Sequence, residues 1–327
     1  MHLNSVGSLW LRRYAMFVAC CTFGLVIAGG LVTSNDAALS VPDWPLSWGR
    51  LVPTLEGGIR YEFAHRVAAM LVGLLTVGLA LAVGTEKPLP DGRGSDGTTH
   101  LHAEPRPSGS GSWLAWAAVA VVLAQAALGG VAVRFVTPAW ATIAHAALGQ
   151  LFFAILVAIC VGLYAGYGGG WAAPTVVCTV ALFSQTILGA CVRYGVMTPV
   201  AHIVGALFAT MLVMWAGLNI LLQNLENPRL RRPALVLLSI TFSQVFLGIG
   251  SYMARIVYAG APQPMPVLVL FTVAHVAVGS LAVGAAVALA MLARPNAFRV
   301  HGGTGCRRTP GGRSTGCCCC IPSWAPA

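Results

Sequence analysis

Long apolar segments separated by short polar ones run along most of the 327-residue chain. A helix needs roughly 20 predominantly apolar residues to cross the hydrocarbon core of a bilayer. Segments of this kind lie near residues 14–33, 62–84, 113–133, 141–165, 171–192, 199–222, 234–253 and 267–293. The pattern predicts an all-α membrane protein with eight transmembrane helices. The first segment has no convincing cleavage site near Gly30, so we interpret it as a retained helix and not as a signal peptide.

Composition and charge agree with a bilayer as the solvent, because 57% of the residues are hydrophobic and only 9% are charged. The net charge of +10 could by itself indicate a nucleic-acid partner. If the N-terminus is cytoplasmic, however, 13 of the 19 Lys and Arg residues fall on the cytoplasmic side, as the positive-inside rule requires. We therefore expect no nucleic-acid partner, and we expect a multi-pass protein of the cell (inner) membrane with both termini in the cytoplasm.

Two polar segments set the expected domain boundaries. Residues 85–112 are rich in Gly, Ser, Pro and charge and predict a disordered cytoplasmic linker, and residues 294–327 predict a disordered cytoplasmic tail. The tail contains the run Cys317–Cys320, which lacks a recognisable metal-ligand spacing. Residues 1–84 with 113–165 form the predicted N-terminal four-helix half, and residues 171–293 form the C-terminal one.

A two-helix unit recurs four times along the chain. One helix of each unit begins with the dipeptide Ala-His, which gives His65, His145, His202 and His275. A small residue follows each histidine at i+4, namely Ala69, Gly149, Ala206 and Gly279. The preceding helix carries Gln-x-x-Leu-Gly in three units, beginning at Gln125, Gln185 and Gln244, and Ala28-Gly29-Gly30 in the first. The repeat predicts two related four-helix bundles with two histidines each.

Histidines within membrane spans are costly and are therefore functional candidates. A single one could be a neutral imidazole bonded to a neighbour, but four at equivalent positions favour metal ligation. Zinc and copper sites need three or four converging ligands, whereas each half offers two imidazoles beside small residues. Two imidazoles in each half match the two axial ligands of a haem iron. The small residues would equally allow close helix packing, and we expect the three glutamines to form interhelical hydrogen bonds.

Charged residues distinguish the two halves. Glu62 precedes His65 by three residues and so shares its helical face, and no acid holds this place in the other units. We predict a chemical role for Glu62, the alternative being an ordinary carboxylate at the membrane boundary. Four arginines on the expected outer side are candidate partners of porphyrin propionates, the alternative being solvated loop charges. They are Arg66, Arg134, Arg193 and Arg255.

These motifs together resemble the haem A synthase family. The resemblance rests on Gly29-Gly30-Leu-Val-Thr33, on the Pro42-Asp43-Trp44-Pro45 loop, on Glu62-Phe-Ala-His65-Arg66 and on the three later histidines, and it runs through residues 14–293. It implies an oxidoreductase that oxidises a ring methyl of haem O to a formyl group, giving haem A for terminal oxidases. The implied partners are haem O, membrane lipid, an unknown electron donor and the farnesyl-transferring haem O synthase, and a homo-oligomer is left open.

The resemblance also implies roles for single residues. His65 and His145 would ligate the iron of the substrate haem, His202 and His275 would ligate the iron of a resident haem b, and Glu62 would be the essential carboxylate. Members of the family often carry two cysteines in the first outer loop, where this chain has Val41 and Ser47. We therefore expect no disulfide in that loop.

Two other functions compete with this interpretation. A bis-histidine membrane b-type cytochrome would carry electrons without substrate chemistry, and the four equivalent histidines fit it equally well. Glu62 and the Pro42–Pro45 loop argue against it, because they occur in only one half. A transporter could use the histidines as a proton relay, but the sequence has no broken helix or central acid pair.

Overall fold

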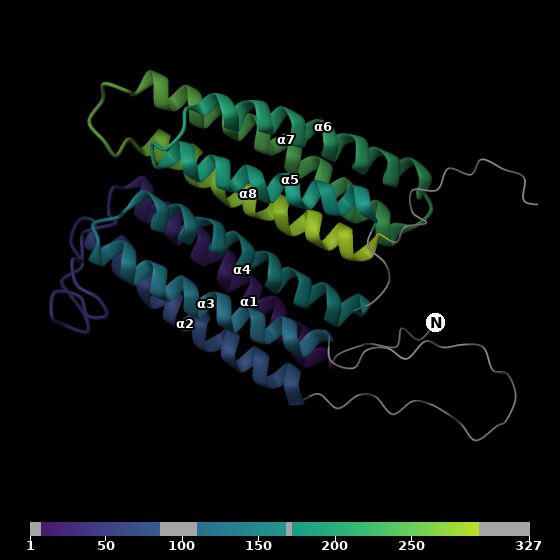
Figure 1. The fold of residues 1–327 in the computed structure, drawn as a ribbon, viewed down its shortest axis with the longest axis horizontal. Helices are drawn as coiled ribbons and strands as arrows, with labels where there is room; N and C mark the ends of the chain where they lie inside the picture. Colours follow the sequence, from purple (N-terminus) through teal and green to yellow (C-terminus); the bar gives the residue numbers. More distant parts are fainter. Residues whose placement is uncertain (1–7, 86–109, 168–171, 294–327) are drawn as a thin grey trace, which may run out of the picture.

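The computed structural model describes residues 8–85, 110–167 and 172–293, and these fold into helices joined by loops. The helices are α1 Leu9–Ser34, α2 Ile59–Thr85, α3 Ser110–Arg134, α4 Ala139–Ala165, α5 Ala173–Arg193, α6 Pro199–Gln223, α7 Pro228–Val257 and α8 Pro266–Leu292 (Figure 1). Within the described residues, all eight are long and apolar enough to cross a membrane. The prediction of an all-α, multi-pass membrane protein is confirmed. The predicted tail and nearly all of the predicted linker lie outside the described residues.

Local sequence explains where several helices begin. Helices α5, α6, α7 and α8 each have proline in the first turn, where the missing backbone N–H needs no partner. Helix α7 starts six residues before the predicted apolar segment, because Asn227 caps it by accepting a hydrogen bond from the Arg229 backbone N–H at 3.2 Å. The first turns of α7 contain several arginines, so the pattern of apolar residues did not include them in the predicted helix.

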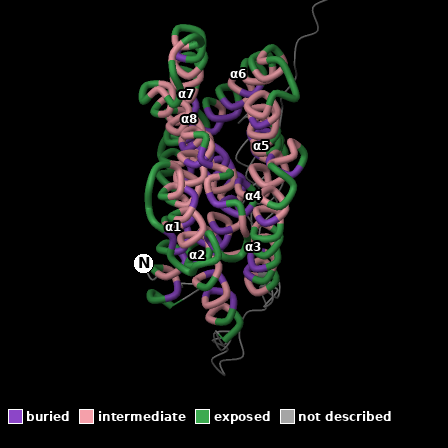
Figure 2. The backbone as a smooth tube through the Cα atoms, turned by 90° about the vertical axis from the view of Figure 1, so that its left-hand side faces the viewer, coloured by how far each residue is buried: buried purple, intermediate pink, exposed green. Residues whose placement is uncertain are grey.

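Helices α1 to α4 form one group and α5 to α8 a second (Figure 1). In the first group α1 contacts α2, α2 contacts α3, α3 contacts α4 and α4 contacts α1, and the second group has the same ring of neighbours. Contacts of α1 and α4 with α8, and of α4 with α5, join the groups, and Figure 2 shows this arrangement from the side. That the two groups are related copies of one unit stays a prediction.

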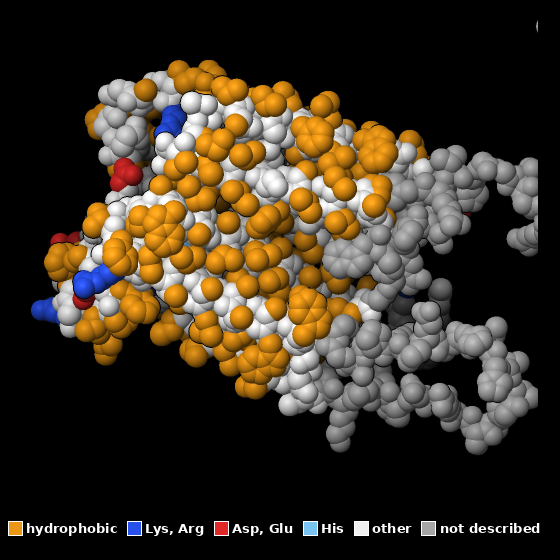
Figure 3. Space-filling model, in the orientation of Figure 1, with side chains coloured by type: hydrophobic (Ala, Val, Ile, Leu, Met, Phe, Trp, Pro, Cys, Tyr) orange, Lys and Arg blue, Asp and Glu red, His pale blue; other side chains and the backbone are white. Residues whose placement is uncertain are grey.

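Buried apolar side chains form two clusters, one in the first group and one mainly in the second. One cluster includes Leu79 and Ile159, and the other includes Ile220 and Leu289, all of them near the ends of α2, α4, α6 and α8. The four histidines lie toward the opposite ends of the same helices, which we call the histidine end. Apolar side chains cover much of the face shown in Figure 3, as lipid exposure requires, and the charged side chains visible there gather at the histidine end.

Candidate functional site

The structure brings the four histidines together two by two. His65 on α2 faces His145 on α4, with ring centroids 6.4 Å apart and ring planes inclined by 72°. His202 on α6 faces His275 on α8 at 6.2 Å and 87°. Each pair thus spans the second and fourth helices of one group, and the two pairs have nearly the same geometry.

A glycine on the preceding helix makes room for each imidazole. The glycines are Gly29, Gly129, Gly189 and Gly248, and Cβ atoms built on them would lie 3.2, 3.6, 3.2 and 3.0 Å from Cε1 of His65, His145, His202 and His275, respectively. Most of these distances are shorter than an ordinary van der Waals contact, so a larger residue would push the ring away. The sequence showed these glycines as part of the repeat, but it did not show that they contact the histidines.

Glutamines hold the backbone of the histidine helices. Gln125 donates its amide N–H to the backbone carbonyl of His145 at 2.8 Å, and Gln244 donates to that of His275 at 2.9 Å. The predicted interhelical hydrogen bonds are confirmed for these two residues. The glycines four residues after these histidines lie against the same amides, since Cβ atoms built on Gly149 and Gly279 would be 2.9 and 3.0 Å from the glutamine Nε2 atoms. In these two units the small residue therefore serves close helix packing.

The side chains of both histidine pairs would be available to hold the iron of a haem. The Nδ1 atom of each of the four rings is buried and has no hydrogen-bond partner. The ring centres of the two pairs are 6.4 and 6.2 Å apart, so each pair would offer two facing imidazoles to one metal centre. Within the described residues, no group of three or more His, Cys, Asp and Glu side chains could hold a metal ion by itself.

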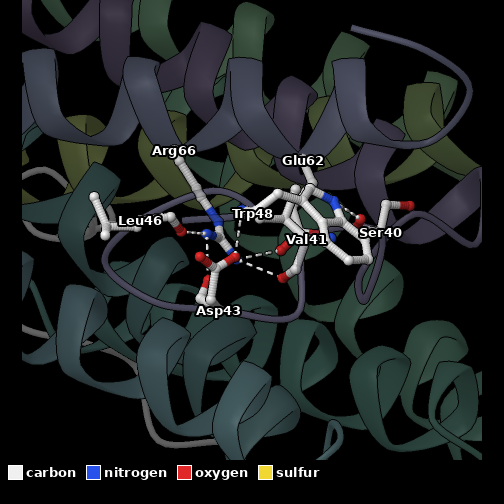
Figure 4. A network of polar contacts seen from close by, with 7 residues as sticks. All are labelled: Ser40, Val41, Asp43, Leu46, Trp48, Glu62 and Arg66. Carbon is white, nitrogen blue, oxygen red and sulfur yellow. Dashed lines mark hydrogen bonds and ion pairs between the residues drawn. The ribbon is translucent and has the colours of Figure 1, made fainter. Parts of the chain in front are cut away.

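Glu62 is buried, with 4% of its surface exposed, and lies in the first turn of α2 (Figure 4). Its Oε1 accepts a hydrogen bond from Arg66 Nη2 at 2.6 Å, which makes an ion pair along the helix. Its Oε2 accepts a hydrogen bond from the Val41 backbone N–H at 2.9 Å. The carboxylate is therefore attached both to its own helix and to residues 35–58, the α1–α2 loop.

Arg66 holds the same loop through backbone carbonyl groups (Figure 4). Its Nη1 donates to the carbonyl oxygens of Asp43 at 2.8 Å and Leu46 at 3.0 Å, and its Nη2 donates to that of Val41 at 3.0 Å. We call Glu62 and Arg66, with the backbone groups of these three residues, the loop anchor. A guanidinium suits this role because its rigid fork carries five donors.

Asp43 organises the loop beyond the anchor. Its carboxylate accepts hydrogen bonds from the backbone N–H groups of Trp48 at 2.6 Å and Gly49 at 2.7 Å. The hydrogen bond from Gly49, followed by that from Trp48, holds the pKa of Asp43 below its ordinary value. The indole of Trp44 covers Gly130 of α3, where a built Cβ would lie 3.2 Å from the ring. The loop is therefore tied to α2 and also packed on α3.

The other predicted arginines lie at the histidine end with different surroundings. Arg193 donates from Nη2 to Ser34 Oγ at 3.1 Å, which links the two helix groups. Arg134 and Arg255 are exposed at the ends of α3 and α7. Val41 and Ser47, the two positions compared above with cysteines, are both buried. The pairing of these arginines with propionates, and the chemical role of Glu62, stay predictions.

The chain is similar to curated haem A synthases over part of its length. It is 28% identical over 80 residues to the one from Hyphomonas neptunium, covering 24% of this chain and 23% of that protein. It is 37% identical over 75 residues to the one from Exiguobacterium sibiricum (21% and 25%), and 35% identical over 69 residues to the one from Symbiobacterium thermophilum (21% and 22%).

No protein-family model matches the chain. The chain spans about a quarter of the length of the curated relatives it matches. The resemblance that the histidine and loop motifs indicated is nevertheless confirmed, as a similarity to haem A synthases over about a fifth of this chain.

Proposed function

We propose that this chain is a haem A synthase, an oxidoreductase that converts a ring methyl of haem O to the formyl group of haem A. One observation carries the proposal. Two histidine pairs have matching geometry, but among the described residues only one of them lies beside a buried carboxylate and an anchored loop. Two equivalent pairs fit two haems, and the added acid fits a reaction at only one of them.

In this proposal each half has its own role. His202 and His275 hold the iron of haem b, and His65 and His145 hold the iron of the substrate haem. The bound iron supplies the redox chemistry that side chains cannot supply. The protein contributes the position of the two rings, a site sheltered between helices, and the Glu62 carboxylate.

Glu62 is proposed to hold or move a proton at its carboxylate during the reaction. The carboxylate is shielded from solvent, since only 4% of the residue's surface is exposed. Its two hydrogen bonds, from Arg66 and Val41, fix its orientation at the start of α2. The proposal also includes the cell membrane as location, cytoplasmic termini and an external electron donor.

A membrane b-type cytochrome remains the second candidate, because the two pairs differ by only 0.2 Å in ring separation, 6.4 against 6.2 Å. Such a protein would bind haem B at both pairs and would not need Glu62. It would also have no use for haem O.

Pigment extraction from the purified chain, expressed in cells that make haem O, tests the proposal. We expect haem B together with haem O or haem A. In Glu62→Gln, haem A should fall by roughly a hundredfold or more while haem B is retained. Glu56→Gln is the matched control, because Glu56 is an exposed acid of the same loop. Haem B alone in the wild-type protein would establish the cytochrome instead.

The assignment of the two pairs has its own test. His202→Ala and His275→Ala should abolish a low-spin bis-imidazole spectrum of haem b, whereas His65→Ala should leave that spectrum in place and stop haem A formation. A spectrum that survives in the His202→Ala, His275→Ala double variant contradicts the assignment.

A further inference from the structure

A groove of about 490 Å³ lies between α1 and α8, near the histidine end. Its apolar lining comes from the membrane-spanning parts of both helices and includes Ile27, Leu31, Val269, Leu270, Val273 and Ala277. A volume of this size is typical of a site for a small organic ligand. None of these residues is one of the four histidines, although Ala274 and Ala277, which both line the groove, lie on either side of His275 on α8.

The groove is polar at only one end. Asn35, the C-cap of α1, lines it there and donates its amide to the Leu31 carbonyl at 2.8 Å. Tyr61, in the first turn of α2, lines the same end and accepts a hydrogen bond from Arg60 Nη2 at 3.1 Å. The other end, about two helical turns deeper along α1, is lined by Ile27. Such a groove suits a flexible apolar chain whose polar attachment lies at the histidine end.

The polar end of the groove lies close to the first histidine pair. Tyr61 is one helical turn before His65 on α2, which separates their Cβ atoms by roughly 6 Å. Gly29, which the His65 ring contacts, lies on α1 between two residues that line the groove. The next residue, Gly30, lies against Val273 of the groove wall, at 3.6 Å from a built Cβ. One helix, α1, therefore has the His65 ring on one side and the groove on another.

We propose that this α1–α8 groove holds the isoprenoid tail of haem O while its macrocycle is bound at the first histidine pair. The inference rests on the proposed function, and it adds a site for the part of the substrate that does not react. The tail is the group that distinguishes haem O from haem B. Of the groove's lining residues, Tyr61 lies on the helix that carries His65, so a tail held there would favour haem O over haem B at the first pair.

Groove-filling variants test the inference by binding and not by turnover. Leu270→Trp and Val269→Trp place an indole in the groove, and Leu270 is 66% exposed, so the first variant should fold normally. Val180→Trp on α5 is the control, because Val180 is 59% exposed and lies outside the groove. The protein is titrated in nanodiscs with haem O and, separately, with haem B. Haem O should bind roughly tenfold more weakly to the groove variants and equally to the control, while haem B binding stays unchanged.

A photoreactive benzophenone residue at position 270 gives an independent measurement. Irradiation with bound haem O should produce a haem–protein adduct detectable by mass spectrometry, and the same residue at position 180 should not. An adduct with phospholipid acyl chains only, in the presence of saturating haem O, overturns the inference. Equal weakening of haem O and haem B in the groove variants overturns it as well.

The experiments distinguish a wrong tail site from a wrong proposed function. If the groove variants bind haem O normally and still form haem A, the tail lies elsewhere and the proposed function stands. If the wild-type protein binds haem O no more tightly than haem B and forms no haem A, the proposed function fails, and the tail site fails with it.

Discussion

Replacing Arg66 with alanine should release the α1–α2 loop from α2. The substitution removes the hydrogen bonds to three loop carbonyls and leaves the buried Glu62 carboxylate without its cation. Removing one partner of a buried ion pair costs roughly 3–5 kcal/mol. The Arg66 side chain is 17% exposed and Glu62 keeps its bond from Val41, so we expect the lower value, about 3 kcal/mol.

Hydrogen exchange followed by mass spectrometry measures this cost locally. A loss of about 3 kcal/mol corresponds to roughly 100-fold faster exchange, because each 1.4 kcal/mol is a factor of ten. The increase should be confined to amides of the α1–α2 loop, such as that of Val41, which donates to Glu62, and that of Trp48, which donates to Asp43 in the segment that Arg66 holds. Arg66→Lys should give an intermediate increase, because an ammonium group cannot reproduce the fork of the guanidinium.

Arg60→Ala is the control for the loss of a positive charge at the same end of α2. Arg60 is exposed, and its described hydrogen bond goes to the neighbouring Tyr61. Its removal should leave loop exchange unchanged. Unchanged exchange in Arg66→Ala, or an equal rise in Arg60→Ala, would refute the idea that Arg66 fixes the loop.

Three further results are expected. Gly248→Ala places a Cβ atom 3.0 Å from the His275 ring, so the affinity for haem B should weaken roughly tenfold. Gly73→Ala is the control, because a Cβ atom there has nothing within 4 Å, and it should retain haem B fully. Gln125→Leu removes the bond to the His145 carbonyl, costs about 1 kcal/mol, and should lower the thermal midpoint in detergent by about 2 °C. The pKa of Asp43 is lower in the folded protein than in the unfolded chain, so its hydrogen bonds stabilise the loop above the unfolded pKa, and this stabilisation is lost as the pH falls through the folded pKa. Loop hydrogen exchange, corrected for intrinsic rates, should therefore rise in acid for the wild type. Asp43→Asn should lose this acid dependence.

The apolar pattern predicted the helices well because membrane spans are set by length and hydropathy alone. It failed at the start of α7, where Pro228 and the arginines that follow extend the helix beyond the apolar segment. Proline in the first turn and a capping Asn227 are local signals that the hydropathy pattern does not weigh. They could have moved the predicted boundary to the observed one.

The site was predictable only in part. The repeated Ala-His dipeptides placed the four histidines at one level of the bundles, which follows from helical geometry. The contact of each ring with a glycine depends on which helices are neighbours, although a glycine at the same place in four preceding helices was a usable signal. The bonds of Arg66 could not be predicted, because backbone carbonyls 20 to 25 residues away carry no side-chain signature.

The connections at the histidine end explain why the anchor occurs once. The α1–α2 loop covers residues 35–58, whereas the other connections there cover residues 135–138, 194–198 and 258–265. The α1–α2 loop is the longest of these four connections, and a loop of this length without secondary structure of its own is often functional. The α1–α2 loop also loses more conformational entropy on ordering than the shorter connections do, and the charged hydrogen bonds of the loop anchor offset this cost.

Glu62 therefore has two proposed roles, proton transfer and anchoring of the loop, which a single substitution would not separate. Glu62→Ala would remove both the proposed proton-carrying group and one side of the loop anchor, whereas Arg66→Ala breaks the anchor and keeps the carboxylate, which then lacks its cation. Glu62→Gln keeps a carbonyl oxygen for the Val41 N–H but cannot carry the proton. If haem A formation is lost in Glu62→Gln while loop exchange stays near that of the wild type, the carboxylate acts in the chemistry. If haem A formation falls only in variants whose loop exchange rises, Glu62 is a positioning residue and the proton must be carried by another group.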